Sequence, residues 1–201
     1  MPKLLEPEYS AMTTVTSRRF TLDEYQRLGE LGFFREDERV ELIRGEIIQM
    51  PTKKTPHSVC NTRLVRKLIL LLGERAIVRG QEQIILPADS EPQPDGVIAR
   101  NRSDDYLSSH PEPAEILLLI EISDSTLRYD QQTKLSLYAE DGISDYWIFN
   151  LLENHLETYS EPYQDRQGKF SYRSKRIVLS NEVVTLPCFP DLSLDLTEIF
   201  P

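Results

Sequence analysis

A run of apolar residues that leads into a carboxylate at position 121 constrains the fold of this chain more than any other stretch. Residues 116–120 are all isoleucine or leucine, which is typical of a strand buried on both faces. Period-2 alternation places Leu117, Leu119, Glu121 and Ser123 on one face of this strand. Burying a lone carboxylate is costly unless a cation or hydrogen-bond donors compensate it. We therefore expect Glu121 to face a charged group.

A second carboxylate precedes another short apolar strand. Asp95 follows a proline and comes just before residues 97–99, which are Val-Ile-Ala. If the two strands are neighbours, Asp95 and Glu121 can converge on one hard cation. Mg²⁺ suits such a place because it takes one or two carboxylates, a backbone oxygen and waters.

A lysine follows on a predicted helix. In a helix that begins near Asp130, Asp130, Lys134 and Tyr138 are spaced by four and share one face. Lys134 would then lie at the edge of the apolar stripe and could reach inward. The alternative is an exposed Lys134 paired with Asp130, which itself would cap the helix N-terminus.

Together these segments resemble a known family. The segments that carry the resemblance are residues 90–95, 119–126, 129–130, 134–139 and 142–147. From about residue 21 to residue 200 the chain is similar to the Uma family of putative restriction endonucleases, within the PD-(D/E)XK nuclease-like superfamily. The resemblance implies an α/β fold with a restriction-endonuclease-like core, in which helices flank a mixed central β-sheet. It also implies an N-terminal helix and hairpin and a C-terminal antiparallel β extension.

The resemblance also implies roles for individual residues. Asp95 and Glu121, with the carbonyl of Ile122, would bind Mg²⁺ or Mn²⁺, and Lys134 would orient the attacking water and offset phosphate charge. In most of the superfamily the lysine stands two residues after the glutamate, where this chain has Ser123. Lys134 is similar to the migrated lysine of variant members.

Asp130 and Ser123 are secondary candidates for the site, and the resemblance adds three more. Glu41 and Glu46 resemble the acidic positions of the family's N-terminal hairpin, and either could add a carboxylate or simply face water. His57 opens the second predicted helix, where the resemblance would place it near the cleft. Alone, it would be a surface or capping histidine.

Composition limits the partners. The chain has 23 basic and 33 acidic residues and a net charge of −10, which counts against tight non-specific binding to nucleic acid. Local basic spots such as residues 53–54 and 173–176 could still line a cleft. No apolar run is long enough to span a membrane and the first residues lack a secretory signal, so we expect a cytoplasmic protein. Cys60 and Cys188 have no metal-ligand spacing and are expected to be core residues.

The remaining patterns give the order of the elements. Residues 21–24 form a capping box that starts a helix, residues 40–50 read as a hairpin, and residues 56–72 form a second helix that ends at Gly73. The polar loop 101–113 is expected to lie over the site. We expect residues 1–19 to be a flexible tail and residues 20–201 to form a single endonuclease-like domain.

The function expected from these features is metal-dependent hydrolysis of phosphodiester bonds in nucleic acid, with DNA as the expected substrate. Cutting both strands of a duplex favours a homodimer. A catalytically silent module that binds nucleic acid or protein is the alternative, which Ser123 favours. A different metal hydrolase, with His57 as a ligand, is weakly supported because the three histidines show no spacing typical of metal ligands. A purely structural subunit is a further alternative, which would leave Glu121 without a cation.

Overall fold

The computed structural model describes residues 16–35, 37–87 and 89–201. The predicted tail, residues 1–19, therefore lies mostly outside the described residues. In its described part, Arg18 forms an ion pair with Glu24, and Arg19 forms one with Glu46. Among the described helices, none combines the length and the apolar character that a membrane span needs.

The N-terminal elements form where the sequence predicts them. Helix α1 (Leu22–Glu30) starts with a complete capping box, in which Thr21 and Glu24 each accept a hydrogen bond from the other's backbone N–H. Strands β1 (Val40–Ile43) and β2 (Glu46–Gln49) pair antiparallel. Arg44 and Gly45 join them with φ values of 49° and 77°, the left-handed backbone that a two-residue hairpin turn needs. Helix α2 (Thr55–Leu72) ends at Gly73, as predicted.

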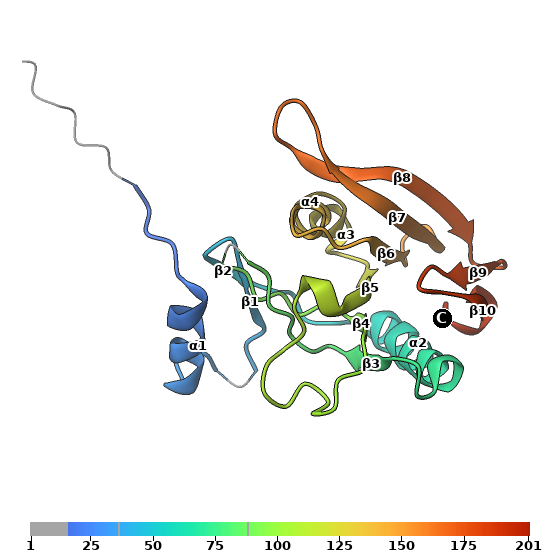
Figure 1. Cartoon of the computed structure of the whole chain (residues 1–201), viewed down its shortest axis with the longest axis horizontal. Helices are drawn as coiled ribbons and strands as arrows, with labels where there is room; N and C mark the ends of the chain where they lie inside the picture. The colour runs from blue at the N-terminus through green and yellow to red at the C-terminus, as the bar shows by residue number, and fades with distance from the viewer. Residues whose placement is uncertain (1–15, 36, 88) are drawn as a thin grey trace, which may run out of the picture.

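A six-stranded sheet forms the centre of the fold (Figure 1), in the order β3-β4-β5-β6-β7-β8. Its strands are β3 (Ile77–Gly80), β4 (Gly96–Ala99), β5 (Ile116–Ser123), β6 (Asp145–Asn150), β7 (His155–Gln164) and β8 (Phe170–Leu179). Only β5 and β6 are parallel, so the sheet is mixed, as predicted. Residues 83–86 contribute no strand to this sheet; Leu86 makes a single bridge to Ser90.

The connection between the two parallel strands is helical. It contains α3 (Leu127–Tyr129), η2 (Asp130–Lys134) and α4 (Leu135–Glu140), and a short turn, η1 (Pro113–Glu115), precedes β5. The helix begins three residues before the predicted start, so Asp130 lies inside the helix and is not its N-cap. Residues 130–134 form a π turn, in which the N–H of Leu135 donates to the carbonyl of Asp130. The chain ends with the hairpin β9 (Val183–Leu186) and β10 (Phe189–Asp195) and the turn η3 (Leu196–Glu198).

The sheet separates two hydrophobic cores. Helix α2 and the β9–β10 hairpin cover one face, where Leu64 and Leu68 pack with Trp147 of β6. Helix α4 covers the other face, where Tyr138 packs with Tyr146. Figure 1 shows α2 and α4 on opposite sides of the sheet. All three aromatic residues of β6, Tyr146, Trp147 and Phe149, are buried in these cores.

Two details differ from expectation. Leu117 packs with the α2 core and Ile116 with the α4 core, the reverse of strict alternation, because the β4–β5 register shifts beside Ala99. From Leu118 to Ser123 the alternation holds. Cys60 is buried in the core as predicted, whereas Cys188 is only half-buried against it; both are free thiols.

Candidate active site

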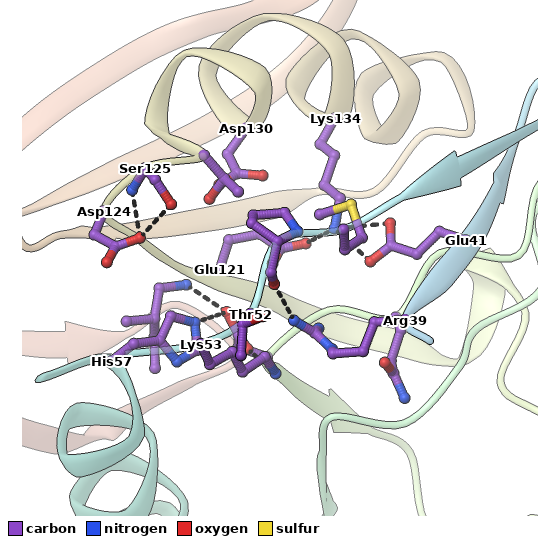
Figure 2. A pocket seen from close by; sticks show the side chains of 16 residues that line it. Arg39, Glu41, Thr52, Lys53, His57, Glu121, Asp124, Ser125, Asp130 and Lys134 are labelled. Carbon is purple, nitrogen blue, oxygen red and sulfur yellow. Dashed lines mark hydrogen bonds and ion pairs between the residues drawn. The ribbon is translucent and has the colours of Figure 1, made fainter. Parts of the chain in front are cut away.

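Four charged side chains from separate segments meet at the sheet face beside η2. Glu41 comes from β1, Asp95 from the residue before β4, Glu121 from β5 and Lys134 from the π turn. Each is nearly inaccessible to solvent, with exposed fractions of 1%, 4%, 4% and 1%. Figure 2 shows Glu41, Glu121 and Lys134 converging on one pocket. The structure therefore brings the three predicted catalytic residues together with Glu41.

Asp95 is held by four hydrogen-bonding groups, of which Gln81 Nε2, at 3.4 Å from Oδ1, is the most distant. Beyond the last β4–β5 pair, the N–H of Ile122 donates to Asp95 Oδ2 at 2.9 Å. Nε2 of His57 lies 3.0 Å from the same oxygen, and Lys53 Nζ donates to Oδ1 at 2.9 Å. Burial opposes ionisation of Asp95, but His57 and Lys53 outweigh it and lower the pKa to about 2. Asp95 is thus a carboxylate at neutral pH.

Glu121 shares one oxygen between two donors. Its Oε1 accepts from Lys134 Nζ and from the Tyr138 hydroxyl, each at 2.8 Å. Burial raises the pKa of Glu121 to about 8, although the Lys134 ammonium opposes this shift. Lys134 also donates to Glu41 Oε1 at 3.1 Å. Burial alone would lower the pKa of Lys134, but the charges of Glu121 and Glu41 raise it well above its usual value. The alternative of an exposed Lys134 paired with Asp130 is wrong.

Asp130 and Ser123 form a second buried pair beside these groups. Ser123 Oγ and Thr126 Oγ1 each donate to Asp130 Oδ2 at 2.7 Å. Burial raises the pKa of Asp130. Its other oxygen, Oδ1, is buried and has no hydrogen-bond partner within the described part of the chain. Ser123 is therefore a buried hydrogen-bond donor to Asp130.

Glu46 lies away from the other candidates. It is exposed, pairs with Arg19 at 3.1 Å and does not line the pocket. Loop 101–113 also contributes no pocket-lining residue, contrary to expectation. Its Arg102 binds Asp104 at 2.6 Å and stacks over Tyr106 at 4.0 Å, which fixes the loop elsewhere.

The pocket is instead lined by Met50, Pro51, Thr52 and Lys53. They belong to residues 50–54, which join β2 to α2 and which we call the 50–54 segment; Figure 2 shows its Thr52 and Lys53 at the pocket. Lys53 reaches Asp95 from this segment, and Arg39 donates to the carbonyl of Pro51 at 3.1 Å. Sequence reasoning missed the bonds that Lys53 and Tyr138 make to the two acidic residues. Its only signal for Lys53 was the basic pair at residues 53–54.

The pocket is small and lined by carboxyl groups. Its volume of about 30 Å³ admits roughly one or two water-sized particles. Four buried carboxyl groups face it, those of Glu41, Asp95, Glu121 and Asp130, together with the buried ammonium of Lys134 and the partly exposed Lys53 and Arg39. Burial raises the pKa of Glu121 to about 8 and raises that of Asp130, because crowded carboxyl groups in a dry site resist ionisation. A divalent cation in the pocket would favour their ionised forms.

The donor set suits a hard ion. Within the described ranges, no three His, Cys, Asp or Glu side chains are grouped so that they could hold a metal between them. Asp95 and Glu121 together with a backbone carbonyl and waters would satisfy Mg²⁺, which is commonly held by one or two carboxylates. The unpartnered Asp130 Oδ1 can accept a hydrogen bond from a water of such an ion.

Comparison with known proteins gives the family. The family model Uma2, described as "Putative restriction endonuclease", matches residues 22–197. The chain belongs to the Uma2 family. The resemblance read from the sequence is thereby confirmed, and this Uma2 protein belongs to a family described as nucleases. Curated protein sequences give no match.

One solved structure is similar to this Uma2 protein over most of both chains. It is described as a putative nuclease belonging to DUF820 from Anabaena variabilis; it covers 90% of this chain and 97% of its own, at 17% identity and a TM-score of 0.68. This likeness confirms the predicted fold. The type IIG restriction endonuclease BpuSI is similar over 63% of this chain and 14% of its own, at 14% identity and a TM-score of 0.35.

Proposed function

We propose that this Uma2 protein is a Mg²⁺-dependent endonuclease that hydrolyses phosphodiester bonds in DNA, with Mn²⁺ as an alternative ion. The observation that carries the proposal is the convergence of four buried carboxyl groups on a small pocket, with the ammonium of Lys134 between Glu41 and Glu121. Carboxyl groups with perturbed pKa values in one pocket are typical of functional sites. Such a cluster at the end of a β-strand is suited to a cation that arrives from outside.

Different residues of the site would fill the different roles that phosphodiester hydrolysis requires. Asp95 and Glu121, with the carbonyl of Ile122, would hold the ion, which when bound would supply an activated water and neutralise phosphate charge. His57 and the Ile122 N–H orient the carboxylate of Asp95 through its Oδ2. The hydroxyl of Tyr138 fixes Glu121 in the same way.

Lys134 is the group proposed to act on the water. Its ammonium lies 2.8 Å from Glu121 Oε1 and lines the pocket, so a water or phosphate oxygen that enters there would be within reach. Asp130, four residues earlier on the π turn, would accept a hydrogen bond from that water through Oδ1. Ser123 positions Asp130 by donating to its other oxygen.

The proposal is tested by a cleavage assay on single- and double-stranded DNA and RNA with Mg²⁺, with Mn²⁺ and with EDTA. We expect the wild-type protein to cut DNA only when the ion is present, and Asp95→Ala to lose this activity while remaining folded by circular dichroism. Cleavage of RNA but not of DNA would show that the substrate is RNA. Absence of cleavage of any substrate with either ion would favour the catalytically silent binding module.

A homodimer is part of this proposal. Strand β8 is an edge of the central sheet, and Ile177 and Leu179 near its end are exposed at 43% and 54%. A second copy joined at this edge would supply the second site needed to cut both strands of a duplex. Light scattering at assay concentrations should give twice the mass of one chain. A monomeric mass with full double-strand cleavage would remove the dimer from the proposal.

A further inference from the structure

Lys53 occupies the place where the proposed ion would approach Asp95. Its Nζ donates to Asp95 Oδ1 at 2.9 Å, and the neutral amide of Gln81 donates to the same oxygen at 3.4 Å, while the other carboxylate oxygen is taken by Ile122 N–H and His57. Of the two donors to Oδ1, Lys53 is the charged one, so a metal ion that approaches Oδ1 must displace its ammonium. Two positive charges at one carboxylate oxygen repel each other, so the ammonium and the ion exclude each other there.

The side chain of Lys53 can move away from Asp95 toward solvent. Counting side-chain atoms alone, Lys53 is 16% exposed and Asp95 is 6% exposed, so Lys53 lies on the outer side of this ion pair. Its backbone is tethered on both sides, because Arg39 binds the carbonyl of Pro51 and Ser58 N–H donates to the carbonyl of Lys54. The four-carbon stem alone can turn the ammonium toward solvent without moving the segment.

The substrate would arrive on that same side. A pocket of about 30 Å³ holds roughly one or two waters, so a phosphodiester must stay at its mouth, where the partly exposed Lys53 is one of the lining residues. A lysine released from Asp95 would lie at this mouth as a point charge suited to phosphate.

We propose that Lys53 is a movable cation that neutralises Asp95 before the metal binds and that binds the nucleic-acid phosphate after the metal has displaced it. Lys53 is in this view a substrate-binding residue whose availability depends on the metal. The inference rests on the proposed metal-dependent function and adds the order of events: without the ion, Lys53 is withheld from the substrate.

The test uses two measurements on Lys53→Gln in the full chain. In a calorimetric titration with MnCl₂, the variant should bind the ion about three- to tenfold more tightly than wild type, because its competitor is gone. The variant should bind a short fluorescent DNA duplex more weakly than wild type does. This measurement uses Ca²⁺, a hard oxygen-binding ion, and the integrity of the duplex is checked. The slope of log affinity against log salt should fall by about one.

Two variants serve as controls. Lys54→Gln removes the same charge one residue away, from a side chain that is 68% exposed and 3.7 Å from Asp124, and should change Mn²⁺ affinity by less than about twofold. Lys53→Arg keeps the charge and should retain the wild-type salt dependence. Thermal unfolding in EDTA establishes that every variant is folded.

The outcomes separate this inference from the proposed function. If wild type binds no Mn²⁺, the metal-dependent function itself fails. If wild type binds Mn²⁺ but Lys53→Gln binds it no more tightly, Lys53 does not compete with the ion and the inference is overturned. Tighter Mn²⁺ binding with an unchanged salt slope would overturn the phosphate contact.

Discussion

Replacing Lys134 by methionine should destabilise the protein by about 3–5 kcal/mol, the cost of leaving buried carboxylates without their cation. Lys134 is 1% exposed and bridges Glu41 and Glu121, so no water can replace its ammonium without opening the pocket. Cleavage measured below the unfolding temperature should also fall, by about 10²–10⁴-fold. Urea unfolding gives the first quantity and single-turnover cleavage the second.

A double variant shows whether the loss is electrostatic. Adding Glu41→Gln to Lys134→Met removes one of the two stranded carboxylates and should restore a large part of the lost stability, but none of the activity. Lys54→Met provides the matched control, since an exposed lysine should cost less than about 0.5 kcal/mol. If Lys134→Met cleaves as fast as wild type, Lys134 is not the catalytic lysine.

Asp95→Asn and Glu121→Gln should each weaken Mn²⁺ binding by at least about 100-fold, because each removes one of only two proposed carboxylate ligands. Both replacements keep the size of the side chain, so the effect should not come from a cavity. Calorimetric titration of MnCl₂ into the three proteins measures it.

Glu46→Gln is the control for the metal titration. Glu46, on β2, is also an acidic residue, but it is exposed and bound to Arg19, so its replacement should leave Mn²⁺ affinity unchanged. Equal affinity in Asp95→Asn, Glu121→Gln and wild type would show that the ion binds elsewhere or not at all.

Much of the fold follows from local chemistry that is visible in the sequence. The capping box at Thr21 and the glycine at position 73 fix helix ends through bonds and dihedral angles of a few neighbouring residues. The apolar run 116–120 fixes a buried strand in the same way. The register shift beside Ala99 could not be read, because it depends on how two distant strands pair.

The site was predictable in its residues and less so in its contacts. Asp95, Glu121 and Lys134 stand out by position, but the choice between Glu41 and Glu46 depends on which end of a short hairpin faces the sheet. Asp130 was expected as a possible N-cap. The helix in fact starts earlier, with Thr126 as its N-cap, a residue type that favours this position although its side chain makes no capping hydrogen bond here.

The π turn at residues 130–134 accommodates one residue more than an α-helical turn would, since its hydrogen bond spans five residues and not four. It holds Asp130 and Lys134 toward the pocket together, although they lie at opposite ends of the turn. A relative with one residue fewer here would form a regular helix, and because the turn had absorbed the extra residue, its lysine would still face the pocket. A gap in an alignment between Asp130 and Lys134 would therefore mark the loss of the π turn and not the loss of the lysine. Chains of this kind should be grouped with that gap allowed.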